Sequence, residues 1–167
     1  YADYREKHRI VEQLKSTFSC GMEEMTQKAV LLLDEIRRLG RKLSNIEKRL
    51  ADEWVRDILS YPQNGQGDIR IVSRLFKEDD ALVTQVVKML LEENHLVFCI
   101  LNQAQDSFTW SIGCSRDLDL GFESFRNDLL TPFSAKGGGR LPLWKGISSS
   151  SRGTEFIDRF LHLALPH

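Results

Sequence analysis

The first third of the chain is a proline-free run of helix formers from Tyr4 to about Leu59, interrupted only by Gly21 and Gly40. It predicts one helix over about 4–18 and, after a break at 19–21, a second over about 22–59. Apolar residues of the second helix recur at alternating steps of four and three: Met25, Ala29, Leu32, Ile36, Leu39, Leu43, Ile46 and Leu50. This heptad seam is typical of a helix that packs along another helix.

The first predicted helix is too short to pack along the whole heptad seam of the second. At 1.5 Å per residue the second helix is about 55 Å long, whereas the first spans only ~20 Å. Three partners remain open: the rest of the same protein, a second copy in a homodimeric coiled coil, or a domain absent from this sequence. Gly40 weakens this helix by about 1 kcal/mol relative to Ala without excluding it.

A turn cluster from Tyr61 to Asp68 separates this arm from the remainder, so we expect a helical arm over 1–62 and a second domain over 63–167. The second part predicts a strand over 69–76, a helix to about 94, a hairpin of strands over 96–114 and a helix over 120–130. A glycine-rich turn, a short strand and a closing helix over 154–165 are expected to follow. This order predicts an α/β (α+β) fold, in which a long helical hairpin precedes a small mixed sheet with helices packed on it.

The amino-acid composition limits the class of protein and the compartment that we expect for this chain. The chain has 167 residues with 23 Lys and Arg against 24 Asp and Glu, so a nucleic-acid site must be local and not a matter of bulk charge. No apolar stretch approaches the ~20 residues of a membrane span, and no signal segment opens the chain. Three cysteines without ligand spacing indicate neither a disulfide framework nor zinc, so we expect a cytoplasmic protein without a membrane partner. The first residue is Tyr1 and not Met, which suggests a piece of a longer protein.

One basic segment departs from this average. Between Asp128 and Glu155 the charged residues are all cations: Lys136, Arg140, Lys145 and Arg152. Gly137, Gly138 and Gly139 predict a turn whose backbone N–H groups a polyanion can approach. Trp144 is a candidate for stacking on a base. A purely structural turn, with Trp144 as a core residue, is the alternative.

The segment from Ser134 to Gly146, SAKGGGRLPLWKG, resembles the glycine motif of the DHH-associated C-terminal domain. That domain ends alanyl-tRNA synthetases and many alanyl-tRNA editing proteins. In that family a second short motif, of the type Ala-Gln-Gly, follows a few residues after the glycine triplet. In this sequence Leu143 to Gly146 stand in its place. The opening segment Tyr1 to Ile10 is similar to the entry into the helical hairpin of AlaX-type editing proteins, and Arg140 favours this branch over DHH phosphodiesterases, which have His there.

The resemblance implies a non-catalytic fragment that binds tRNA, tRNA(Ala) in particular, and that can dimerise. It also implies a parent protein in translation fidelity, an aminoacyl-tRNA deacylase or alanyl-tRNA synthetase relative, whose separate zinc-dependent domain deacylates mischarged tRNA. The expected binding set is Lys136, Gly137, Gly138, Gly139, Arg140, Lys145 and Arg152, and the heptad seam is the candidate dimer interface. Two alternatives remain: a coiled-coil oligomerisation module, or the substrate-binding domain of a DHH-type phosphodiesterase.

The residues themselves predict no catalytic or metal centre in this chain. The four histidines, His8, His95, His162 and His167, are scattered and have no cysteine at ligand spacing. Cys99 and Cys114 lie in apolar strand contexts, where a thiol is buried and unreactive. The glycine triplet lacks the Gly-Lys-Ser/Thr of a nucleotide-binding loop. We therefore expect neither a catalytic residue, a metal nor a cofactor in the fragment.

Overall fold

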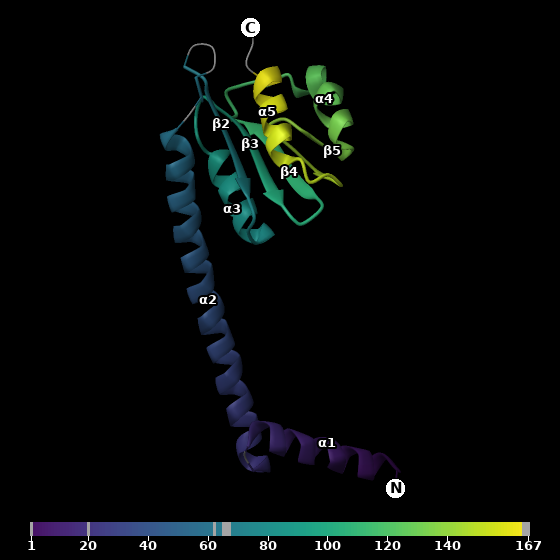
Figure 1. Cartoon of the computed structure of the whole chain (residues 1–167). Coiled ribbons are helices and arrows are strands. Elements are labelled where there is room, and N and C mark those ends of the chain that lie inside the picture. Colours follow the sequence, from purple (N-terminus) through teal and green to yellow (C-terminus); the bar gives the residue numbers. More distant parts are fainter. Residues whose placement is uncertain (1, 20, 62, 65–67, 165–167) are drawn as a thin grey trace. The chain divides into compact units, whose positions relative to one another are not determined.

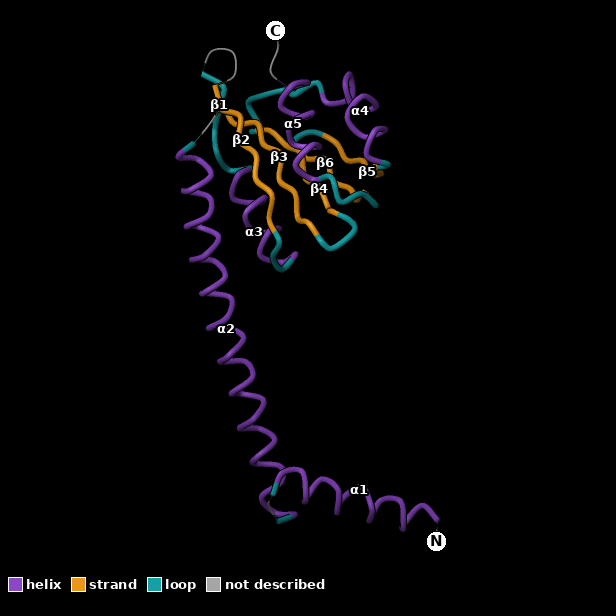
Figure 2. The backbone as a smooth tube through the Cα atoms, in the orientation of Figure 1, coloured by secondary structure: helices purple, strands orange, loops and turns teal. Residues whose placement is uncertain are grey.

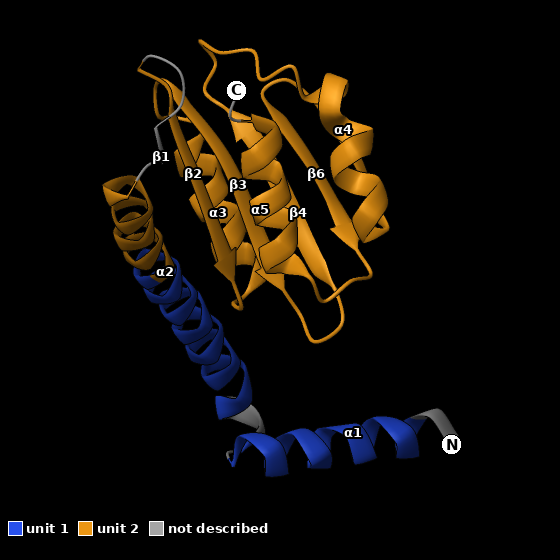
Figure 3. Ribbon diagram, turned by 45° about the horizontal axis from the view of Figure 1, so that its top comes forward, with its two compact units in different colours: residues 1–46 blue, residues 47–167 orange. Residues whose placement is uncertain are grey.

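The computed structural model describes residues 2–19, 21–61, 63–64 and 68–164. The chain forms two compact units, Tyr1–Ile46 and Glu47–His167, which are coloured separately in Figure 3. Each unit is described by itself. The second unit begins inside a helix, at Glu47.

Unit 1 is helical, as the sequence predicts. It contains α1 (Ala2–Phe18) and the first part of α2 (Met22–Ser60). The Lys28 ammonium in α2 donates a hydrogen bond to the Phe18 carbonyl at the end of α1. The central part of the seam is uncovered, because its residues from Leu32 to Ile46 are 45–64% exposed: Leu32, Ile36, Leu39, Leu43 and Ile46.

Unit 2 contains the last turns of α2 and a mixed sheet with helices packed on it, which confirms the predicted fold class. In chain order, as the colours of Figure 1 follow it, its remaining elements are β1 (Gln63–Asn64), β2 (Arg70–Phe76), α3 (Asp80–Leu90), β3 (Leu96–Gln103), β4 (Phe108–Cys114), α4 (Phe122–Leu130), the 3-10 turn η1 (Thr131–Phe133), β5 (Ala135–Arg140), β6 (Leu143–Ser148) and α5 (Gly153–Ala164).

The described strands form one sheet in the order β1-β2-β3-β4-β6-β5, drawn in orange in Figure 2. Strands β2 and β3 are parallel, with α3 as their crossover, and the other neighbouring strands pair antiparallel. The hairpin predicted over 96–114 is β3–β4.

Helices cover both faces of β3, which explains its continuous apolar sequence. On one face Leu96, Phe98 and Ile100 pack in a core cluster with α3 and with Ala51, Val55 and Ile58 from the end of α2. On the other face Val97, Cys99 and Leu101 pack in a second cluster that includes Phe122 of α4 and Phe156 and Phe160 of α5. The two clusters are the core of unit 2.

The structure corrects two expectations about elements. The helix predicted to reach residue 94 ends at Leu90, because the N–H groups of Glu92 and Glu93 bond to carbonyls three residues earlier and continue as a turn. The segment expected to be a glycine turn and then a short strand is the antiparallel hairpin β5–β6, so Gly137, Gly138 and Gly139 lie within a strand and not in a turn.

Close strand packing explains two of these glycines. A Cβ on Gly137 would lie 2.2 Å from the Lys145 carbonyl oxygen, and one on Gly139 would lie 2.3 Å from the Leu143 carbonyl oxygen. Only a residue without a side chain allows β5 to approach β6 this closely. The glycines therefore have a structural role in the strand pair.

Candidate nucleic-acid interface

Strands β4, β6 and β5 present one sheet face, here called the open face. Cross-strand partners project to the same side of a sheet, so the pairing register defines its members. Three rows of partners run across β4, β6 and β5: Thr109, Ile147 and Lys136; Ser111, Lys145 and Gly138; Gly113, Leu143 and Arg140. Ile147 is 55% exposed, and Thr109, Lys136, Arg140 and Lys145 are exposed as well.

On β4 and β6, most residues one position along project to the opposite face and are buried. Phe108, Trp110 and Ile112 of β4 and Trp144 of β6 belong to the core cluster under α4 and α5. The period-2 alternation thus separates the core from the open face. Because Leu143, Lys145 and Ile147 alternate with Trp144, Gly146 and Ser148, this alternation was the signal that could have found the open face in the sequence.

Three predicted binding residues lie together on the open face. Lys136 and Arg140 are four residues apart on β5, which separates their backbones by about 13 Å, and Lys145 lies between them on the neighbouring strand. Within the part of the chain that the structure describes, none of the three forms an ion pair with an acidic side chain. Such a group of exposed cations raises the local concentration of a polyanion.

The glycine segment is part of the same strand pair and is not a separate loop. Gly137 offers its carbonyl to α4, because Arg126 Nη2 donates to Gly137 O over 2.7 Å. Arg126 is bound to Glu123 as well, at 3.3 Å. Helix α4 is thus tied to β5, the last strand of the sheet order.

Trp144 is not available for base stacking, which corrects the expectation from sequence. Its side chain is only 4% exposed. Its ring lies 5.0 Å from the ring of Phe122, measured between centroids. Trp144 is a core residue, and the apolar side chain that β6 exposes is Ile147.

Arg152 is engaged within the protein. Its Nη2 donates to the Pro132 carbonyl over 2.6 Å, and its Nη1 lies 3.3 Å from a Glu155 carboxylate oxygen. The guanidinium also lies 5.0 Å from the centroid of the Phe133 ring. These contacts fix η1 to the start of α5.

The titratable residues outside this face form local pairs. His95 Nδ1 lies 2.7 Å from Asp117, whose pKa is lowered by a hydrogen bond from Ser115 and by the nearby imidazole. Burial raises the pKa of the Cys99 thiol far above its usual range, and it raises that of Cys114. His8 is exposed, His162 has an interaction partner, and His167 lies outside the described residues.

A search of the described residues finds no group of three or more His, Cys, Asp or Glu side chains placed to hold a metal ion. The same residues contain no helix that is long and apolar enough to cross a membrane.

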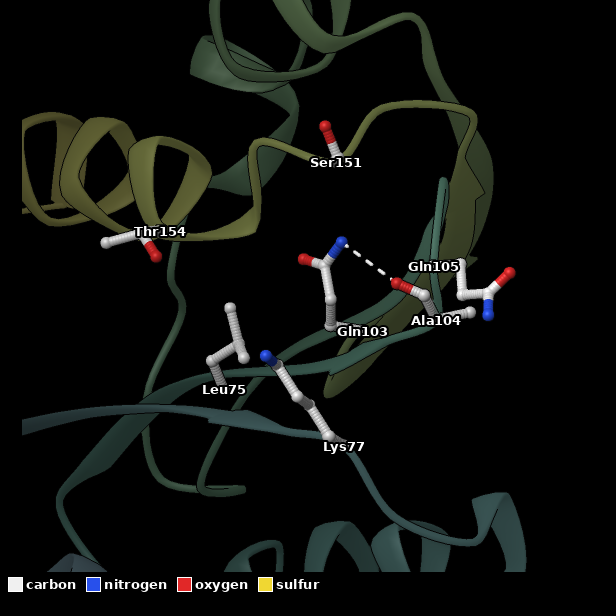
Figure 4. Close-up of a pocket in the computed structure, with 7 residues that line it drawn as sticks. All are labelled: Leu75, Lys77, Gln103, Ala104, Gln105, Ser151 and Thr154. Atoms are coloured by element: carbon white, nitrogen blue, oxygen red, sulfur yellow. Dashed lines mark hydrogen bonds between the residues drawn. The ribbon is translucent and has the colours of Figure 1, made fainter.

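The carboxyl ends of β2 and β3 border a cavity of about 620 Å³ that sequence reasoning missed. Three separate segments line it, which is why no local motif reveals it: Leu75, Lys77, Gln103, Ala104, Gln105, Ser151 and Thr154. Figure 4 shows the side chains of Lys77 and Gln103 among the lining residues, with the Gln103 amide donating to the Ala104 carbonyl over 3.2 Å. Its described lining supplies hydrogen-bonding groups and one cation.

A second cavity of about 340 Å³, here called the α3 groove, adjoins the open face. Helix α3, strand β4 and strand β6 contribute its lining: Asp80, Val83, Thr84, Val87, Thr109, Trp110, Ser111, Lys145 and Gly146. Lys145, Thr109 and Ser111 belong to both the groove and the open face.

No family model matches this sequence, and no curated protein matches it. Solved structures do match, among them the following two. The C-Ala domain from Aquifex aeolicus alanyl-tRNA synthetase aligns with a TM-score of 0.52 and 21% identity, over 63% of this chain and 97% of that domain. CDC45 from Entamoeba histolytica aligns with a TM-score of 0.47 and 13% identity, over 70% of this chain and 27% of that protein. The first likeness shows that the chain shares the fold of a C-Ala domain.

Proposed function

We propose that this chain is a non-catalytic nucleic-acid-binding module and that it binds tRNA through the open face. The observation that carries the proposal is the placement of three exposed cations, Lys136, Lys145 and Arg140, on one sheet face beside the exposed Ile147. Cations contact the phosphate backbone, while an exposed apolar side chain contacts bases or sugars. The fold likeness to a domain of alanyl-tRNA synthetase supports tRNA as the nucleic acid.

The finer proposal concerns the parent protein. We propose that the chain is the C-terminal part of an alanyl-tRNA editing protein or a synthetase relative, of the AlaX and DHH-associated type. A separate zinc-dependent domain would then deacylate mischarged tRNA(Ala), and this chain would hold the tRNA. The glycine-triplet segment and the fold support this proposal.

The test is the double variant Lys136→Ala with Arg140→Ala, measured by fluorescence anisotropy with labelled tRNA over a series of salt concentrations. We expect affinity to fall at least about tenfold and the slope of log K against log salt to shrink by about two, because two phosphate contacts are lost. Competition between tRNA(Ala) and another tRNA then measures specificity.

The matched control is Lys88→Ala with Arg56→Ala, which removes two exposed cations from α3 and α2 and leaves the open face intact. Circular dichroism verifies that both variants keep the fold. Unchanged tRNA binding in the open-face variant, or an equal loss in the control, overturns the assignment of this face.

A second function, self-association, is favoured by the exposed heptad seam. We propose that two copies of α2 pair along the residues from Met25 to Leu50, whose central members are 45–64% exposed. Lys42 precedes Leu43 and Glu47 follows Ile46, and these flanking positions attract each other across a parallel two-stranded coiled coil.

Sedimentation velocity tests the seam. We expect the wild-type chain to be a dimer at micromolar concentration and the variant Leu39→Glu with Leu43→Glu to be a monomer, because charges in the seam cannot be buried. The control Arg37→Glu with Arg41→Glu changes charge outside the seam and should remain dimeric. If the wild-type chain sediments as a monomer at high concentration, this proposal is wrong.

A further inference from the structure

We propose that the α3 groove holds one unpaired nucleotide of the bound nucleic acid, with the base between α3 and β4 and the adjoining phosphate on Lys145. This inference rests on the proposed function, because it requires a nucleic acid on the open face. It adds that the ligand must present at least one unstacked base.

The groove has the size and lining for a single ring system. Its volume of about 340 Å³ lies at the small end of the range for ligand sites. Val83 and Val87 of α3 supply an apolar wall and are themselves 7% and 1% exposed. The facing residues on β4 are Thr109 and Ser111, whose small side chains leave room beside the helix.

Polar groups in the groove are free to meet a base edge. The hydroxyl groups of Thr84, Thr109 and Ser111 make no hydrogen bond within the described parts of the chain. Asp80 Oδ1 accepts from Asn102 Nδ2 over 2.6 Å, which orients the carboxylate at the groove. A carboxylate and hydroxyls together can accept from the exocyclic amine of a base and donate to its ring nitrogens.

Charge decides in favour of a nucleotide over an apolar peptide side chain. Lys145 lines the groove and shares the open face with Lys136 and Arg140, so a phosphate chain across these cations passes the groove mouth. A duplex can lie across the same cations, but its bases stay stacked and do not enter. The groove therefore distinguishes single-stranded from double-stranded nucleic acid.

The test compares a labelled single-stranded RNA oligomer with a blunt RNA duplex of the same length, using the full chain. Thr84→Trp fills the groove from α3. We expect it to weaken binding of the single strand by about tenfold and to leave duplex binding within about twofold, because only the stacked base is displaced. Lys145→Ala should weaken binding of both ligands.

Gln85→Trp is the matched control, since it adds the same side chain at the next residue of α3, outside the groove lining. Ser111→Phe fills the groove from β4 and decides the question if Thr84→Trp does not fold. If a folded variant with a filled groove still binds the single-stranded RNA as tightly as the wild type does, the proposal is wrong, whatever else the groove then binds.

The two proposals fail in different ways. If Lys136→Ala with Arg140→Ala binds RNA as the wild type does, the open face is not the interface and the proposed function fails. If that variant loses affinity while both groove-filled variants keep single-strand binding, the open face stands and only the groove assignment falls.

Discussion

Successive side chains on β6 alternate between the buried core and the open face. Trp144 is 4% exposed, whereas Ile147 is 55% exposed, although both are large and apolar. The difference comes from the strand period and from α4 and α5, which cover only one side of these strands. Residue type alone allowed Trp144 either a stacking role or a core role, and its burial favours the core role.

Cys99 gives a prediction at the same scale. Its side chain is fully buried, and burial raises the pKa of its thiol because the thiolate cannot be solvated there. We expect iodoacetamide to leave Cys99 unmodified in the native protein at pH 8 and to alkylate it in denaturant, as read by mass spectrometry of the peptide. Rapid native alkylation would contradict the burial.

The same shift predicts a pH dependence of stability. The unfolded thiol loses its proton above about pH 8.5, while the buried thiol keeps it. The contribution to stability is therefore present below that pH and is lost as pH rises through the range above it. Cys99→Ala should show a shallower fall in the free energy of unfolding above pH 8.5 than the wild type.

At the scale of elements, the hairpin β5–β6 builds the open face. Its register brings Lys136, Arg140 and Lys145 to one side, although the first and last of them are nine positions apart along the chain. The glycines make this pairing possible by removing side chains that would meet the neighbouring backbone. A glycine-rich segment was predicted as a turn because glycine usually marks one.

The strand pair predicts a contrast between adjacent glycines. Gly137→Ala places a Cβ 2.2 Å from the Lys145 carbonyl oxygen and 2.6 Å from the Trp110 ring, so the backbone must move. At Gly138 the nearest atom is an Arg126 nitrogen at 3.9 Å. We expect Gly137→Ala to lower the free energy of unfolding by about 1–3 kcal/mol and Gly138→Ala to change it by less than about 0.5 kcal/mol in urea denaturation. Equal effects would show that β5 is not held against β6 as described.

For the whole molecule, the two core clusters lie entirely within unit 2. Their buried members run from Ala51 in α2 to Phe160 in α5, and the described part of unit 1 contributes none of them. The seam of unit 1 is exposed instead. Unit 2 thus contains the buried apolar surface that stabilises a domain.

This division predicts that residues 47–167 fold alone. We expect the shortened chain to unfold in urea at the same midpoint as the full chain and to keep its affinity for tRNA, because the core and the open face are both retained. Equilibrium denaturation and anisotropy provide the measurements. A clear loss of stability would show that residues 1–46 stabilise unit 2.

The sequence by itself determined most of the helices and strands, although not β5, because helix and strand periods are local properties of short segments. It predicted both arm helices, the strands β2, β3 and β4, and the mixed α/β class, and it found the cluster of cations without acids. Only the tertiary structure decided the burial of Trp144, the internal contacts of Arg152 and the place of the glycines in a strand, and brought distant segments together in the α3 groove. Those outcomes depend on strand register and on which helix covers which face, and both are set by contacts between residues far apart in the chain.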